Sequence, residues 1–163
     1  MALDIFIKLG TDGSTNAIKG ESIDAMHKGE IEAAAISWGY AQHVTIGSGS
    51  SGAGRVEFQE FHFTKSLDST SPALYAALSA GKHFDKVTVS MRKGGAGGTD
   101  YAHFTLATVF VTSVDGSASS SDDLPIEDVG LAYGGVVWQV GGKGTPAGWS
   151  RVKNGSVKDL GAL

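Results

Sequence analysis

Apolar and polar residues alternate along much of this chain, which is the pattern of half-buried β-strands. The clearest strand candidates are residues 3–9, 86–93, 101–114 and 127–140. In residues 86–93 the apolar face consists of Val87, Val89 and Met91. Residues 101–114, rich in threonine, valine and phenylalanine, form the longest strand candidate. We expect Gly134-Gly135 to interrupt the last of these strands, because glycine weakens a strand interior.

The middle of the chain predicts two more strands with a loop between them. Residues 31–40 are interpreted as a strand, although the alanines at 33–35 would also suit a helix. Residues 47–54, rich in glycine and serine, predict a flexible loop. In residues 55–65 the alternation changes phase at Gln59-Glu60, which indicates a bulge or a strand that passes from one sheet to another.

One short helix is predicted at residues 71–81. Ser71 is a natural N-cap, and Pro72 suits the first helical position because its missing N–H costs nothing there. Gly81 follows the last helical residue, as the left-handed C-terminal position favours. Such a short helix must dock on a sheet, through an apolar face of Leu74, Ala77 and Leu78.

These elements predict a mainly β protein: a compact antiparallel β-barrel or sandwich of two sheets with one short flanking helix at about residues 72–80. Residues 94–98 are interpreted as a hairpin connection. We expect a single domain over residues 1–163, of which residues 141–163 are an extended tail. Within that tail, residues 149–152 and 156–160 predict a last hairpin around Asn154-Gly155.

Composition and charge narrow the function classes. The net charge of −4 disfavours broad binding to nucleic acid or anionic membrane. The chain has no cysteine, which excludes disulfides and thiolate metal sites. No membrane-spanning run or cleavable signal peptide is visible, so we expect synthesis in the cytoplasm and, if the protein leaves the cell, export by another route.

No motif predicts a catalytic, cofactor or metal site. Gly47, Gly49 and Gly52 match the dinucleotide fingerprint, but a strand follows where a phosphate-binding helix is required. The five histidines do not have metal-ligand spacings, and His27 is interpreted as a hydrogen-bonding corner. We therefore predict no catalytic residue, no cofactor and no metal.

Two alternatives from other classes stay open. A carbohydrate-binding β-sandwich module would use Trp38, Trp138 and Trp149, and predicts a monomer whose tryptophan fluorescence is quenched by sugar. Trp38 and Trp138 are more typical of core or interface anchors. A hydrolase assembled around His62 with Glu57 or Glu60 predicts a turnover that is lost on His62→Ala.

Five segments, in order, resemble the haemolysin-coregulated protein (Hcp) family, whose members are tube subunits of bacterial type VI secretion systems. The most informative is residues 19–40, KGESIDAMHKGEIEAAAISWGY; the others are residues 1–9, 54–81, 87–114 and 125–138. Residues 14–17 lengthen the first loop relative to the family, and Trp138 stands where a tyrosine is common.

The resemblance implies a β-barrel subunit that closes into a homohexameric ring. It further implies that rings stack into a tube inside a contractile sheath, with a tip protein at the end, and that contraction expels the tube from the cell. Members are secreted, can shelter small effectors in the lumen, and are similar to phage tail-tube proteins. A chain of this kind is a structural protein and not an enzyme.

Stacked rings need adaptable contacts at their faces, and residues 42–54 are the segment that we expect to supply them. Apolar residues stand there beside a glycine-rich, otherwise exposed stretch. The predicted ring-stacking loop comprises Gln42, His43, Val44, Thr45, Ile46 and Gly47.

Overall fold

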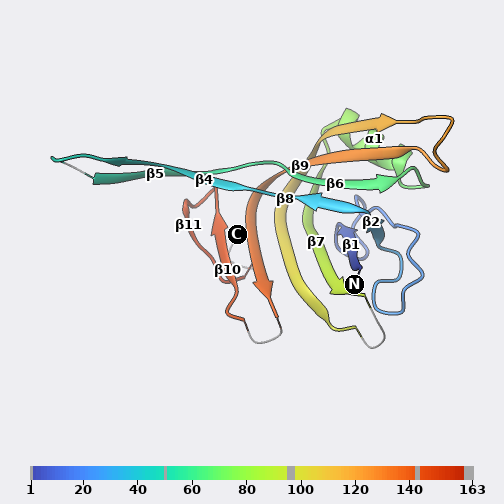
Figure 1. Cartoon of the computed structure of the whole chain (residues 1–163), viewed down its shortest axis with the longest axis horizontal. Coiled ribbons are helices and arrows are strands. Elements are labelled where there is room, and N and C mark those ends of the chain that lie inside the picture. The colour runs from blue at the N-terminus through green and yellow to red at the C-terminus, as the bar shows by residue number, and fades with distance from the viewer. Residues whose placement is uncertain (1, 50, 95–97, 142–143, 160–163) are drawn as a thin grey trace.

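The computed structural model describes residues 2–49, 51–94, 98–141 and 144–159 (Figure 1). These residues confirm a mainly β fold with one short helix. The elements are β1 (Leu3–Leu9), β2 (Ile31–Ala33), β3 (Ala35–Ser37), β4 (Tyr40–Ile46), β5 (Ser51–Phe58), β6 (Phe61–Ser66), α1 (Ser71–Ala80), β7 (His83–Lys93), β8 (Asp100–Ser117), β9 (Ile126–Val140), β10 (Ala147–Ser150) and β11 (Gly155–Ser156).

Nine strands form one antiparallel sheet, seven of them in the order β11-β10-β9-β8-β7-β1-β2. Two further strands belong to it off this path, because β6 pairs with β9 and β3 pairs with β6. Strand β9 therefore has three partners: β8 along most of its length, β6 at residues 126–131 and β10 at residues 135–138. The sheet curls around a core to which every strand from β6 to β9 contributes.

Hydrogen bonds among the described residues do not close the predicted barrel. The single strand predicted at residues 31–40 divides at Ala34, so that β2 pairs with β1 and β3 pairs with β6. At the division, the Ala34 N–H donates to the Thr64 carbonyl at 2.7 Å. The two half-strands thus lie against opposite ends of the sheet, and the ladder from β1 to β6 is broken between them.

The second sheet is the β4–β5 hairpin (residues 40–58), which extends away from the main sheet (Figure 1). The flexible loop predicted at residues 47–54 is wrong for its second half, because β5 begins at Ser51 and pairs with β4 from Ile46 to Tyr40. Residue 50 lies outside the described residues. The phase change at Gln59-Glu60 is confirmed as a passage between sheets, since β5 ends before it and β6 begins after it.

Helix α1 is confirmed with one correction at its start. Thr70, and not Ser71, occupies the N-cap position, and it makes no side-chain capping bond. Ser71 is instead a buried helical residue whose hydroxyl serves the ion cluster described below. Gly81 ends the helix with a left-handed φ of 62°. Leu74 and Ala77 are buried where the helix lies against β8.

Two predictions about the last third of the chain have different outcomes. Gly134-Gly135 does not interrupt β9. Gly134 lies beside Thr108 of β8, which has the unusual φ of 51°, and a Cβ added at Gly134 would be in ordinary van der Waals contact with the Thr108 side chain, at 3.4 Å. The last hairpin is confirmed in β10 and β11, around Asn154-Gly155, although residue 160 of its predicted second arm lies outside the described residues. Residues 95–97 of the predicted connection between β7 and β8 also lie outside them.

A buried ion cluster ties α1 to the sheet. The Lys65 Nζ lies 2.8 Å from Asp68 Oδ1 and 2.9 Å from Glu127 Oε2, and it donates to Ser71 Oγ at 3.0 Å. The Ser71 hydroxyl in turn donates to Glu127 Oε2 at 2.7 Å. Burial opposes ionisation of Asp68, but hydrogen bonds from Lys65 and Thr70 outweigh it and lower the pKa of that carboxyl. The positive charge of Lys65 is therefore balanced by the two carboxylates that contact it.

Residues 19–30 form a loop that is held against the sheet by an ion pair. Arg92 of β7 contacts Asp24 through two bonds, of 2.6 Å and 3.1 Å, and the Met26 N–H donates to the same carboxylate at 2.9 Å. The Arg92 guanidinium and this N–H hold the pKa of Asp24 well below its usual range.

His27, in the same loop, is the hydrogen-bonding corner that the sequence indicates. Its ring is buried and stacks on Phe6 at 4.2 Å between centroids. Its two nitrogens lie 3.0 Å from carboxylate oxygens of Glu30 and Asp100.

Replacing Lys65 by alanine should cost about 3–5 kcal/mol of unfolding free energy, because the buried Glu127 carboxylate and the partly buried Asp68 carboxylate would lose their cation. Urea unfolding followed by circular dichroism measures this loss. Lys82→Ala, at an exposed position after α1, is the control and should change stability by no more than about 0.5 kcal/mol. Equal losses in the two variants would contradict the role of the cluster.

The lowered pKa values of Asp24 and Asp68 predict loss of stability in acid. The stabilisation is complete above the unfolded carboxyl pKa of about 3.9, and it is lost as the pH falls through the folded-state values. The urea midpoint should therefore fall between about pH 5 and pH 2. Asp24→Asn should make that fall smaller, whereas Asp122→Asn, in an exposed loop, should leave it unchanged. A steep fall retained in Asp24→Asn would contradict the assignment.

Candidate assembly surface

The six residues predicted to form a ring-stacking loop lie in and directly after β4. The structure places them on an ordered hairpin and not in a flexible loop, and all six are exposed: Gln42, His43, Val44, Thr45, Ile46 and Gly47. A register shift between Gln42 and Val44 marks a β-bulge in the hairpin. The strand partners of this segment come from β5, so the candidate surface includes both strands.

One face of the β4–β5 hairpin is apolar along most of its length. Side chains of β4 on this face alternate with those on the other, and each lies beside its partner from β5. The apolar members are Tyr40, Val44, Ile46, Ala53, Val56 and Phe58. The side chains of Val44 and Ile46 are 57% and 85% exposed. The described residues of a single copy therefore leave the outer part of this face uncovered.

The opposite face of the hairpin is polar, and the outer part of the hairpin is uncharged. His43 and Glu57 lie 3.5 Å apart there, both largely exposed. Residues 44–54 contain no charged side chain. A contact made by the outer part must therefore rest on apolar burial and neutral hydrogen bonds, and not on ion pairs.

At its root, the hairpin lies over a groove of about 340 Å³ that β9 and β10 complete. Aromatic side chains dominate the groove, whose lining includes Tyr40, Phe58, Trp138 and Trp149. The rings of Tyr40 and Phe58 are 5.4 Å apart, and Phe58 is 5.7 Å from Tyr133. Burial raises the pKa of the Tyr40 and Tyr133 hydroxyls, so both stay protonated near neutral pH. This packing fixes the direction in which the hairpin leaves the sheet.

The three tryptophans do not form one sugar-stacking platform. Trp38 and Trp138 both contact the buried Phe104, at 4.8 Å and 5.7 Å between ring centroids, and they remain 43% and 39% exposed. Trp149 lines the root groove, and its indole N–H is buried.

The structure brings together only part of the site that the hydrolase alternative predicts. His62 lies 2.9 Å from Asp128 and 3.5 Å from Glu60, whereas Glu57 pairs with His43 instead. His62, Glu60 and Asp128 are all partly exposed, on the outer side of β6 and β9. The three side chains are between 35% and 45% exposed, so the cluster lies at the surface and not in an enclosed site.

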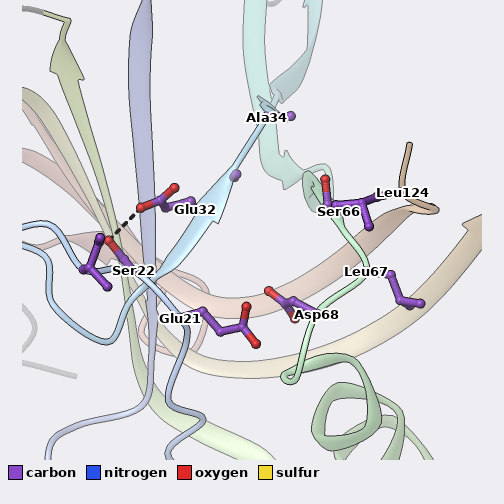
Figure 2. Close-up of a pocket in the computed structure, with 10 residues that line it drawn as sticks. Glu21, Ser22, Glu32, Ala34, Ser66, Leu67, Asp68 and Leu124 are labelled. Atoms are coloured by element: carbon purple, nitrogen blue, oxygen red, sulfur yellow. Dashed lines mark hydrogen bonds between the residues drawn. The ribbon is translucent and has the colours of Figure 1, made fainter. Parts of the chain in front are cut away.

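A second surface feature, here named the acidic cleft, has a volume of about 510 Å³. It lies between the loop that precedes β2 and the connection from β6 to α1 (Figure 2). The carboxylates of Glu21, Glu32 and Asp68 line it, and the apolar side chains around them are Ile23, Leu67 and Leu124. Glu32 accepts a bond from the Ser22 hydroxyl at 2.8 Å, and Glu21 accepts one from the Ser69 N–H at 3.1 Å.

The acidic cleft was not predicted from the sequence, because its lining comes from four separate segments of the chain. The one local signal was Ile23, a large apolar residue in the middle of a polar turn. Ile23 is 92% exposed, and a single exposed apolar residue does not by itself indicate a site.

The described part of the chain contains neither a metal site nor a membrane-spanning helix. Within it, no group of three or more histidine, aspartate and glutamate side chains is arranged to hold a metal ion. The helix in that part is too short to span a bilayer.

Comparison with known proteins gives a consistent result. The family described as "Type VI secretion system effector, Hcp" matches residues 6–140. The Hcp1 protein of Pseudomonas aeruginosa is 39% identical over 138 residues, which cover 83% of this chain and 82% of that protein.

Solved structures agree with this match. A type six secretion system protein superposes with a TM-score of 0.85 at 29% identity, covering 96% of this chain and all of the other. Hcp1 from Salmonella typhimurium gives 0.76, also at 29% identity and with the same coverage. The cap of the anti-feeding prophage tube, at 0.54 and 13% identity over 84% of this chain and 88% of its own, shares the fold alone.

The match over most of the chain, together with the mainly β fold and its single flanking helix, shows that this protein belongs to the Hcp family of type VI secretion systems.

Proposed function

We propose that this chain is a structural subunit of the inner tube of a type VI secretion system. Six copies close into a ring, the rings stack into a tube, and contraction of the surrounding sheath expels that tube from the cell. The subunit is made in the cytoplasm and is secreted with the tube. Its partners are other copies of itself, the sheath and tip proteins, and small effectors carried in the lumen.

The observation that carries this proposal is the uncovered apolar face of the β4–β5 hairpin. A two-stranded hairpin is only marginally stable in water unless something packs on it. Here the outer half projects from the main sheet with Val44 and Ile46 exposed. A neighbouring copy that covers these side chains stabilises both the hairpin and the assembly.

Assembly, and not chemistry, is the function that the surface supports. A ring requires two different complementary patches on each subunit, and stacking of rings requires a further contact at the ring face, for which we assign the projecting hairpin. The ion-pair groups around His27, His62 and Lys65 are explained by the fold, so we assign no catalytic residue. The work of ejection comes from the sheath.

The mass of the purified chain in solution tests ring closure. Light scattering should give about six times 16.8 kDa, roughly 100 kDa, with ring-shaped particles in negative stain. A strict monomer at high concentration would remove the main support for the proposal. Quenching of tryptophan fluorescence by sugars would then be the next assay.

Deleting residues 44–52 tests the role of the hairpin. The deletion removes the outer half of β4–β5 and leaves the main sheet intact, so thermal unfolding should be nearly unchanged. Stacking should be impaired, seen as shorter tubes in electron micrographs under conditions that favour tubes. Intact tubes after the deletion would refute the assignment.

A finer variant separates the apolar face from the presence of the hairpin itself. Val44→Ser with Ile46→Ser makes the exposed face polar and should weaken stacking. Thr45→Ser, on the opposite face of the same strand, is the matched control and should stack like the unmodified chain.

A further inference from the structure

We propose that the groove between β5 and the β10–β11 hairpin binds an acidic peptide segment of a partner protein. The carboxylates of that segment pair with Arg55 and Arg151, and a neighbouring aromatic or large apolar side chain enters the root groove. The site goes beyond the proposed function, because ring closure and stacking do not require it. Residues 44–54, the outer part of the hairpin assigned to stacking, do not line either groove.

This groove, here named the arginine groove, has a volume of about 370 Å³ and lies beside the root of the β4–β5 hairpin (Figure 1). Strands β5 and β9 and the β10–β11 hairpin supply its lining, which includes Arg55, Phe58, Tyr133, Trp149, Arg151 and Asn154. Phe58 and Trp149 also line the root groove, so the two grooves adjoin at these side chains.

The two arginines of the groove form no ion pair with a carboxylate of the described residues. The Arg55 Nε donates to the Asn154 side-chain oxygen at 3.3 Å, and the Arg151 Nη1 donates to the Tyr133 carbonyl at 3.2 Å. A guanidinium has five N–H donors, so both side chains keep donors for a ligand. Arg92, the third arginine of the chain, is by contrast paired with two aspartates.

The charge of the groove favours an anionic ligand. No carboxylate is among the described residues that line either groove, although the chain has 17 acidic side chains against 13 lysines and arginines. Two guanidiniums without a counter-ion create a local positive potential, and arginine binds carboxylates through two parallel N–H donors. The Arg151 guanidinium also lies over the Phe58 ring, 5.6 Å from its centroid, and is thereby oriented before a ligand arrives.

The root groove indicates that the anion belongs to a larger molecule with an apolar part. Aromatic rings dominate its lining, and they favour contact with an aromatic or large apolar side chain. The indole N–H of Trp149, which lines both grooves, is buried without an acceptor among the described residues. A buried donor without an acceptor costs free energy, and a carbonyl of a bound peptide would supply one.

The main chain of β5 favours a peptide over other anions. Among the described strands, β5 pairs with β4 on one edge and with none on the other. Residues of β4 line the root groove but not the arginine groove, which places the arginine groove on the side of β5 away from β4. An extended peptide there can pair its backbone with the free edge of β5, whereas a nucleic acid has no such backbone groups.

Fluorescence anisotropy of a labelled peptide tests the site. The probe is Glu-Phe-Glu-Phe-Glu-Phe with fluorescein at its N-terminus, titrated with the purified full chain, and the matched peptide has glutamine in place of each glutamate. We expect saturable binding of the acidic peptide and at least about tenfold weaker binding of the glutamine peptide, because the charge-assisted bonds to the arginines are lost. Equal affinity for the two peptides, or binding of neither, would overturn the proposal.

Variants assign the binding to the groove. Arg55→Gln, at an exposed position, should weaken binding of the acidic peptide at least about fivefold. Arg151→Lys keeps the charge but not the planar fork, so it should weaken binding less than Arg151→Gln does. Lys82→Gln removes one positive charge outside the groove and should bind like the unmodified chain. An Arg55→Gln variant that binds as tightly as Lys82→Gln would contradict the assignment.

Competition against the labelled probe identifies the class of ligand. The unlabelled acidic peptide should displace the probe at a concentration at least about tenfold lower than inorganic phosphate or a six-nucleotide single-stranded DNA, because it alone uses the root groove and the edge of β5. Displacement by phosphate or DNA at the lower concentration would show a general anion site and overturn the proposal.

Light scattering on the same proteins separates this inference from the proposed function. An Arg55→Gln variant that assembles like the unmodified chain but has lost the peptide supports a site distinct from the assembly contacts. A chain that assembles and does not bind the probe overturns this inference alone. A chain that binds the probe and stays a monomer overturns the proposed function alone.

Discussion

The architecture depends on how strand β9 shares its backbone hydrogen bonds. One edge of β9 pairs with β8, while its other edge pairs first with β6, up to Leu131, and then with β10, from Gly135 onward. Strand β10 therefore occupies the second half of that edge, next to the half that pairs with β6. Strand β5 cannot continue beside β9, so it pairs only with β4, and the two together leave the sheet as a hairpin. Strand β10 thus occupies the part of the β9 edge along which β5 would have to continue.

That division of β9 leaves the subunit with an exposed apolar surface on the β4–β5 hairpin. In a closed single-chain barrel, the apolar side chains of β4 and β5 would have turned inward against the core. Here only the root is packed, through the Tyr40, Phe58 and Tyr133 rings, and the outer apolar face meets water. Hydrophobic burial is the main driving force for association as it is for folding. The free energy that the hairpin does not gain within its own chain is available for contact with another copy.

Period-two alternation made most strands predictable, because side chains on a half-buried strand must alternate between core and solvent. The helix was predictable from Pro72 and Gly81, whose backbone preferences are local. The predictions that were wrong concern features that depend on contacts between segments far apart in the sequence. The division at Ala34 depends on β1 and β6 competing for one segment, and the order in residues 51–54 depends on pairing with β4. Ser71 was predicted to be a cap because no local sequence pattern indicates that its hydroxyl bonds to Lys65 and Glu127. The acidic cleft was invisible for the same reason, since its lining comes together only in the fold.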